Sequence, residues 1–297
     1  MANPREIHRR MRSVKNIQQI TKAMKMVAAA RLRRAQEKAA STRPFADKIE
    51  KLLLTVVSDK SVLSDVSQKD APLLAQRPVR KTGFIVVAAD KGLAGSYNSN
   101  LLKHAVAEIA ETESYYLITV GRKAKEFFQH RGYDVAKDIF GLSDKPNFEY
   151  AEQIAKAAVD AFKSGEVDEV KLISTRFKSA LSYTPETQNL LPVLPPAAEG
   201  QGKGEAGAEA GEVLFESPAE GMLAQLLPYY VNTRIYAALM QSAASELGAR
   251  MTAMSSATDN ASDLLRSLEL SYNKARQAGI TREINEIVGG AEALQQS

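Results

Sequence analysis

The stretch that decides the fold runs from Pro218 to Gly290 and reads PAEGMLAQLLPYYVNTRIYAALMQSAASELGARMTAMSSATDNASDLLRSLELSYNKARQAGITREINEIVGG. Apolar and small residues recur in it at steps of three and four, which is the spacing of one face of an α-helix. This stripe comprises Leu223, Leu227, Val231, Ile235, Leu239, Leu247, Met251, Met254, Ala257, Ala261, Leu264, Leu268, Ala275, Ile284 and Val288. We therefore expect a helix over residues 218–288, which would be about 105 Å long.

Both ends of this expected helix carry recognisable signals. Ser217, Pro218 and Glu220 supply a capping hydroxyl, a first-turn proline and an acid at the third position. The pair Gly289-Gly290 predicts the end of the helix, because glycine readily adopts the left-handed conformation that closes many helices. Pro228 lies in the early turns, where proline can bend a helix.

The first sixty residues follow the same pattern. Asn3, Pro4 and Glu6 form a start signal of the same kind. The apolar or small residues that follow are Ile7, Met11, Val14, Ile17, Ile20, Met24, Val27, Ala35, Ala39, Ile49, Leu53 and Val56. They predict a helix over residues 4–58, roughly 80 Å long, with a proline at position 44 where it can kink.

Neither helix can bury so narrow a stripe alone, so each needs a partner with a matching stripe. Because one compact domain connects them, we expect the two helices to form an antiparallel coiled coil. Small residues at 243–245, 248–249 and 255–257 would allow close approach of the backbones. The second helix is longer by roughly 15 residues, so about 20 Å of its end should project as a single helix. The alternative is that both helices fold back onto a large globular core.

Between residues 80 and 195 the pattern alternates between strand and helix. Strands are expected at 83–89, 115–120, 135–139 and 169–175, and helices at 98–112, 123–130 and 148–163. Such βαβ alternation predicts a Rossmann-like α/β domain with a mostly parallel sheet. We thus expect a long helix over 1–60, the α/β domain over 80–195, a flexible loop rich in Pro, Gly, Ala and Glu over 196–212, and a long helix over 213–290.

A glycine-containing turn follows the first expected strand and reads Asp90-Lys91-Gly92-Leu93-Ala94-Gly95-Ser96. A glycine loop between a strand and a helix can hold nucleotide phosphates. The full three-glycine dinucleotide fingerprint is missing, however, and no P-loop Gly-Lys-Ser/Thr follows. The other interpretation, which we favour, is a tight structural turn in which Asp90, Lys91, Gly92 and Gly95 take part and Gly92 adopts a positive φ.

Composition excludes several classes of protein. With 44% hydrophobic and 25% charged residues the chain is typical of a water-soluble protein. It has no cysteine, and His8, His104 and His130 lie far apart without metal-ligand spacing, so we expect no disulfide and no metal. No grouping of residues typical of a catalytic or cofactor site stands out, and we expect neither activity nor cofactor in the chain itself.

Positive charge gathers at one end. Residues 1–38 hold eleven Lys and Arg against two acids, a local net charge of +9, whereas the whole chain carries +4. Such an asymmetry indicates a partner of opposite charge. A removable targeting peptide and a nucleic-acid-binding arm are two alternatives. The first conflicts with the unbroken helical pattern, and the second with the lack of interleaved aromatic residues.

Three segments resemble the γ subunit of rotary F-type ATP synthases. The run KNIQQITKAMKMVAA over residues 15–29 looks like the N-terminal helix of that family, and Ala89-Asp90-Lys91-Gly92-Leu93 looks like its conserved turn. The closest match lies at the other end, in ATDNA over 257–261, YNKARQ over 272–277 and ITREINEIVGGA over 280–291. The resemblance covers essentially the whole chain, except that the loop over 196–211 fits poorly.

The resemblance implies a rotor shaft inside a ring of three α and three β subunits, with its base on the ε subunit and on the membrane ring of c subunits. It implies no bond-making by this chain, no nucleic-acid partner and membrane contact only through the c-ring, at the cytoplasmic face of a bacterial plasma (inner) membrane. The residues that it implies for contact with β are Arg9, Arg10, Lys22, Met24, Lys25, Arg31, Arg33, Arg34, Arg250, Gln277, Thr281 and Glu283. Periodicity alone would equally place Met24 in ordinary coiled-coil packing.

Overall fold

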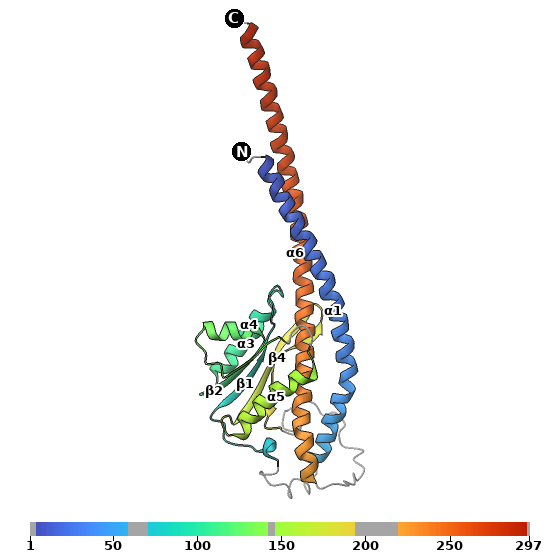
Figure 1. The fold of residues 1–297 in the computed structure, drawn as a ribbon, viewed down its shortest axis with the longest axis vertical. Helices are drawn as coiled ribbons and strands as arrows, with labels where there is room; N and C mark the ends of the chain where they lie inside the picture. The colour runs from blue at the N-terminus through green and yellow to red at the C-terminus, as the bar shows by residue number, and fades with distance from the viewer. Residues whose placement is uncertain (1–3, 59–70, 142–145, 194–218, 296–297) are drawn as a thin grey trace. The chain divides into compact units, whose positions relative to one another are not determined.

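The computed structural model describes residues 4–58, 71–141, 146–193 and 219–295 (Figure 1). The loop expected over 196–212 and the capping residues Asn3, Ser217 and Pro218 lie outside the described residues. The chain divides into two compact units, residues 1–29 with 250–297 and residues 30–249. The helices α1 (Pro4–Ser58) and α6 (Ala219–Gln295) contribute to both units. The four domain ranges drawn from the sequence stay a prediction.

The unit of residues 30–249 contains a five-stranded sheet in the order β3-β2-β1-β4-β5. Its strands are β1 (Thr82–Val87), β2 (Tyr115–Val120), β3 (Lys137–Ile139), β4 (Glu169–Ser179) and β5 (Ser182–Leu191). The first four run parallel, and β5 pairs antiparallel with β4 at the edge. The central strand β1 is buried along its whole length, as a run of Phe, Ile and Val in a doubly covered sheet requires.

Helices cover both faces of this sheet (Figure 1). Alternate residues of β1 face opposite sides. Phe84 and Val86 pack with α3 (Tyr97–Ala110) and α4 (Arg122–His130), whereas Ile85 and Val87 pack with α5 (Phe148–Lys163) and the first half of α6. A short 3-10 helix, η1 (Pro72–Leu74), adds Leu73 to the second layer. The predicted α/β class with a mostly parallel sheet is confirmed.

The first half of α6 is part of this layered core. From Leu223 to Ala249 most of its residues are buried, because one side packs on the sheet and another on α1. Of the small residues expected to let the two long helices approach, some face α1 and others face the sheet. Ala244 lies against Leu32 of α1, whereas Gly248 faces the turn between β4 and β5, where an added Cβ would lie 3.1 Å from the carbonyl oxygen of Ala180.

Gly248→Leu is expected to lower the free energy of unfolding by about 1–3 kcal/mol, because a large side chain meets the backbone of the β4–β5 turn and must push it away. Urea denaturation followed by circular dichroism measures the change. Gly279→Leu is the matched control on the same helix, since nothing lies within 4 Å of its added Cβ. Equal losses of unfolding free energy in the two variants would mean that the β4–β5 turn moves away at no cost. The close approach of Gly248 to Ala180 would then not contribute to stability.

The unit of residues 1–29 and 250–297 is an antiparallel pair formed by the start of α1 and the second half of α6 (Figure 1). Its direction follows from the cross-helix contacts. Lys25 bonds Ser255, Gln18 bonds Ser262, and the ring of His8 lies 6.0 Å from that of Tyr272. Residue numbers along α6 therefore increase in the direction in which residue numbers along α1 decrease. The predicted antiparallel coiled coil is confirmed.

The seam of this pair differs from the expected one. The side chains of Ile17, Ile20 and Val27, expected to face α6, are 50%, 58% and 53% exposed. Their neighbours Thr21 and Ala28 are buried instead, at 9% and 2% exposure. Apolar periodicity misplaced the seam by one residue at these positions, because hydrogen bonds to α6 satisfy the polar residues that face inward. Met24, which belongs to the same predicted stripe, is half-buried.

The end of α6 also differs from the prediction. The helix passes Gly289-Gly290 and continues to Gln295. Glycine stops a helix only where it adopts the left-handed conformation; within a helix it is tolerated at about 1 kcal/mol each, and good helix formers follow it here. Counting from the His8–Tyr272 contact, the start of α1 at Pro4 lies level with about Arg276. The remaining turns of α6 thus extend beyond α1 as a single helix.

Candidate functional site

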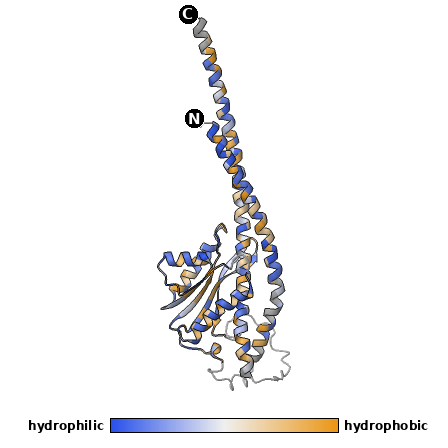
Figure 2. Ribbon diagram, in the orientation of Figure 1, coloured by the Kyte–Doolittle hydropathy of each residue, from blue (hydrophilic) through white to orange (hydrophobic). Residues whose placement is uncertain are grey.

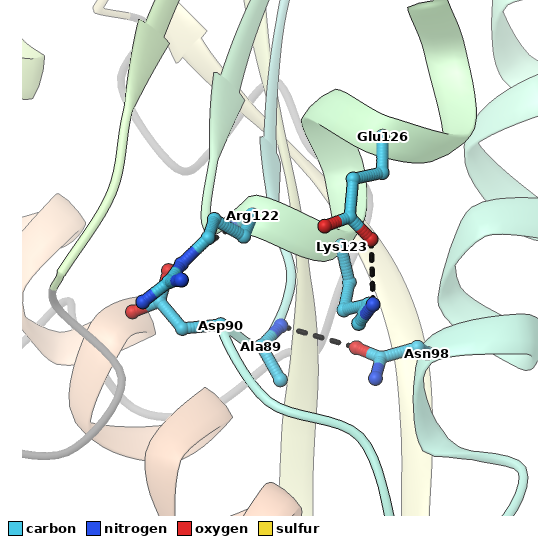
Figure 3. Close-up of polar contacts among 6 residues, drawn as sticks. All are labelled: Ala89, Asp90, Asn98, Arg122, Lys123 and Glu126. Carbon is cyan, nitrogen blue, oxygen red and sulfur yellow. Dashed lines mark hydrogen bonds and ion pairs between the residues drawn. The ribbon is translucent and has the colours of Figure 1, made fainter. Parts of the chain in front are cut away.

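The turn after β1 is joined to neighbouring helices by hydrogen bonds (Figure 3). The carboxylate of Asp90 accepts hydrogen bonds from the backbone N–H groups of Arg122 and Gly141, at 3.0 and 3.1 Å. The side-chain oxygen of Asn98 accepts from the N–H of Ala89 at 3.1 Å. Asp90 thereby ties the end of β1 to the first residue of α4 and to the segment after β3.

The positive φ expected at Gly92 lies elsewhere. Within the turn, Leu93 has φ 63° and Gly95 has φ 56°, whereas Gly92 does not adopt the left-handed region and an added Cβ there would meet nothing within 4 Å. The expectation for Gly92 is therefore wrong, while Gly95 meets the requirement in its place. An exposed leucine in this conformation is unusual, since its Cβ is crowded by the backbone there.

The crevice that would hold a nucleotide is filled by α6. In a doubly wound sheet the ligand lies beyond the strand ends where the strand order reverses, here between β1 and β4. Ala94 and Tyr97 are buried there against Ala249 of α6, and the Tyr97 hydroxyl donates to the carbonyl oxygen of Ser242 at 3.3 Å. Burial raises the pKa of Tyr97 well above its ordinary value, so the phenol remains a protonated donor. This packing favours the structural interpretation of the turn over phosphate binding.

The basic residues named from the resemblance lie at the surface. Arg9, Arg10, Lys22, Lys25, Arg31, Arg33 and Arg34 are all exposed. Two of them form ion pairs one turn along α1, Arg10 with Glu6 at 2.7 Å and Arg33 with Glu37 at 3.0 Å. Exposed pairs of this kind contribute little to stability, about 0.3–0.5 kcal/mol each. The guanidinium groups of Arg10 and Arg33 can therefore leave these pairs at little energetic cost.

The other named residues are Met24 on α1 and four residues of α6, and they lie at two levels along α6. Arg250 and Met24 are half-buried, and Met24 is next to Lys25, whose ammonium donates to Ser255 at 2.9 Å. Gln277, Thr281 and Glu283 are exposed and lie roughly 40 Å further along the helix. The structure thus brings Met24 and Lys25 close to the start of the Arg250–Gln295 segment and leaves the second group on the single-helix end.

Exposed apolar side chains accompany both groups, and the sequence did not identify them as a surface. On α1 they are Ile17, Ile20, Met26 and Val27, and on the last turns of α6 they are Ile280, Ile284, Ile287 and Val288. Figure 2 shows orange apolar residues recurring among blue polar ones along these turns. A signal existed in the sequence: Gln18 and Thr21 on one helix and Thr258 and Ser262 on the other share the seam spacing, which indicates a polar seam.

Within the part of the chain that the structure describes, no group of three His, Cys, Asp or Glu side chains could hold a metal ion. No described helix combines the length and apolar character needed to cross a bilayer.

Comparison with known proteins identifies the family. A family model described as ATP synthase matches residues 3–294. The chain is 46% identical to the ATP synthase gamma chain of Heliobacterium modesticaldum, over 99% of this chain and 100% of that one. It is 45% identical to the gamma chain of Brevibacillus brevis, over 97% and 98%.

Solved structures agree with this result. A chain of the central stalk and c-ring of the Tetrahymena thermophila mitochondrial ATP synthase matches with a TM-score of 0.62 and 27% identity, covering 80% of this chain and 99% of that one. A chain of the Euglena gracilis mitochondrial ATP synthase shares the fold, with a TM-score of 0.65 at 20% identity over 98% and 94%. Matches of this length, identity and number leave no room for a chance likeness, and the chain belongs to the ATP synthase γ chain family.

Proposed function

We propose that this chain is the central rotor shaft of an F-type ATP synthase, coupling ion flow through the membrane c-ring to ATP synthesis or hydrolysis at the β subunits. The observation that carries the proposal is the end of α6, where residues 280–289 are exposed all round and still bear four large apolar side chains. A single helix with such a surface is marginal in water and gains stability when other subunits surround it.

The shaft makes and breaks no covalent bond. A β subunit that can be open or closed shifts toward the state that the adjacent face of the shaft contacts better. Because the paired helices present different side chains at each angle, one turn of the shaft takes every β subunit through the same sequence of states. Catalysis lies in the partner subunits, and this chain contributes a changing surface.

The contacts suit a rotating part. Exposed Lys and Arg side chains form ion pairs worth about 0–1 kcal/mol each, which are weak enough to exchange as the shaft turns. Arg9, Arg10, Lys22, Lys25, Arg31, Arg33 and Arg34 would pair with acidic groups of β, and Met24 offers a flexible side chain that adapts to changing neighbours. Arg250, Gln277, Thr281 and Glu283 would contact β from α6. The turn at Asp90, Lys91, Gly92 and Gly95 would serve to hold the α/β domain together.

The remaining partners follow from the same assignment. The α and β subunits would surround the paired helices, and the α/β domain would rest on ε and on the c-ring. The chain would then be peripheral, at the cytoplasmic face of the bacterial plasma membrane, and would contact the membrane only through the c-ring.

Neutralising part of the basic arm tests the proposal. The double variant Arg9→Gln/Lys22→Gln is expected to slow association with the α and β subunits on the order of tenfold at low salt, because long-range attraction steers the encounter. Stopped-flow reconstitution measures the rate across a series of salt concentrations. The control is Lys103→Gln/Lys156→Gln, which removes the same charge from exposed positions on α3 and α5.

The control variant should associate at the wild-type rate, and the rate of the arm variant should depend less on salt. If the full-length chain forms no complex with the α and β subunits, the proposed function is wrong. If it forms one but both variants behave alike, the basic arm has no part in assembly.

A further inference from the structure

On α1, two neighbouring series of residues could each form the seam with α6. The inward series contains Gln18, Thr21 and Ala28, and the outward series contains Ile17, Ile20 and Val27, each one residue earlier. The members of each series are three and seven residues apart, which fits the heptad spacing of a coiled-coil seam. The positions between them do not follow this division, since Met24 is half-buried and Lys25 is exposed. Within this segment the more apolar series is the one that faces outward.

A small rotation would exchange the two faces. One residue corresponds to about 100° around a helix of 3.6 residues per turn. Turning this part of α1 by that angle would bury the two isoleucines and the valine and expose the glutamine and the threonine. The hydrophobic effect favours that exchange, so some other interaction must hold the observed setting.

Hydrogen bonds across the seam supply this interaction. The side-chain amide of Gln18 donates to the hydroxyl of Ser262 at 2.7 Å, and the hydroxyl of Thr258 lies 2.8 Å from that of Thr21, to which it can donate. Thr21 in turn donates to the carbonyl oxygen of Gln18 at 3.0 Å, and Ser262 donates to that of Thr258 at 2.9 Å. We call Gln18, Thr21, Thr258 and Ser262 the polar ladder.

We propose that the polar ladder sets the rotational position of α1 on α6 and thereby keeps Ile17, Ile20 and Val27 on the outer surface. A rotation would separate Gln18 and Thr21 from their partners on α6 and leave the hydroxyls of Thr258 and Ser262 facing isoleucine. These two hydroxyls would keep only their bonds along α6, to the carbonyl oxygens of Met254 and Thr258. A single polar residue at a seam position can fix the register of a coiled coil in the same way. This inference goes beyond the shaft proposal, because it concerns which residues of α1 face outward. It does not depend on which partner covers them.

Cysteine labelling of the full-length chain tests the ladder, since the natural sequence contains no cysteine. Ile17→Cys reports the outer face and Ala28→Cys the inner face, each introduced alone. The rate of reaction with a maleimide is measured in the wild-type background and in Thr258→Val/Ser262→Ala, which removes the ladder partners on α6. With the ladder intact, position 17 should react fast and position 28 slowly.

Without the ladder, position 17 should slow and position 28 should accelerate, each by at least about tenfold, as solvent access is exchanged between the faces. Unchanged rates would overturn the proposal. Fast reaction at both positions would also overturn it, because the ladder would then only hold the helices together. Adding Gln18→Leu/Thr21→Val to the ladder-free background should restore the wild-type pattern, since no inward polar group is left without a partner.

The matched control removes two hydroxyls of the same helix that do not take part in the ladder. In Ser267→Ala/Ser271→Ala the lost hydrogen bond runs along α6, from the Ser271 hydroxyl to the carbonyl oxygen of Ser267, and is exposed. Labelling at positions 17 and 28 should stay at wild-type rates in this background. A reciprocal change here would show that any loss of hydroxyls on α6 rotates α1, and would contradict a specific role for the ladder.

Discussion

Replacing Gly121 by alanine is expected to lower the free energy of unfolding of the α/β domain by about 3–5 kcal/mol. Gly121 lies between β2 and α4 with φ 92°, and an added Cβ would lie 2.2 Å from the carbonyl oxygen of Ala88. That carbonyl cannot easily move away, because the N–H of Ala88 bonds Val120 and the carbonyl of Ala89 bonds Lys123, at 2.9 and 3.0 Å. The alanine variant therefore has two costs: the strain of a positive φ at a residue with a Cβ, and the clash of that Cβ with the backbone of Ala88.

Chemical denaturation of the Gly121 variant measures this loss, and Gly132→Ala separates the two contributions. Gly132 also has a positive φ, 74°, but nothing lies within 4 Å of its added Cβ, so only the strain of about 1 kcal/mol should appear. A Gly121 variant no less stable than the Gly132 variant would contradict the close approach of these two strand ends.

Truncation after Arg276 is expected to uncouple hydrolysis from proton pumping while leaving every catalytic group in place. The cut removes the part of α6 that extends beyond the start of α1, including Gln277, Thr281 and Glu283. If the shaft directs the β subunits through this end, ATP-driven proton uptake per ATP hydrolysed should fall roughly fivefold or more. Quenching of a pH-sensitive dye in inverted membrane vesicles, with phosphate release in parallel, gives this ratio.

A shorter truncation after Val288 is the control for the end of α6. It removes the glycine pair and the last turn of the helix but keeps the three residues proposed to contact β. Near-normal coupling is expected, because most of the single-helix end remains. If the longer truncation also pumps normally, the end of α6 is not what directs the β subunits.

Much of the fold could be predicted because local pattern and burial agree. The runs at 115–120 and 148–163 were predicted with the boundaries that β2 and α5 have. Strand β5 was missed, since it is rich in polar residues and contains Pro185, which argues against a central strand. At the edge of the sheet such a proline is acceptable, because an edge strand has unpaired N–H positions. Edge position is a property of the tertiary structure and cannot be read from residue spacing.

The coiled-coil seam could be predicted only where it is apolar. Ile7 faces inward as the periodicity requires, but Ile17 and Ile20 do not. A periodicity argument assumes that the most apolar face of a helix is the buried one. That assumption fails where hydrogen bonds satisfy a polar seam, as they do between Gln18 and Ser262.

The candidate site itself depended on family resemblance. A positively charged outer face has the same spacing whether it is merely hydrated or docks against acidic groups, so nothing in the sequence alone distinguishes Lys22 from a solvated lysine. The polar turn was easier to interpret, because Asp90 and Gly95 have local geometric reasons for their identity. The positive φ nevertheless falls on Leu93 and Gly95 and not on Gly92, since the residue that takes the left-handed conformation depends on the detailed path of the turn.

As a rotor shaft, this chain is expected to turn inside a ring of catalytic subunits. The direct test is a single-molecule measurement on the complex of this chain with its α and β subunits, immobilised through β. A bead attached to Lys103→Cys on α3, in a chain that has no other cysteine, reports the angle. The account predicts ATP-driven rotation in one direction with three stops per turn, one for each β subunit. Steady ATP hydrolysis by a complex in which the bead only fluctuates about a fixed angle would contradict it.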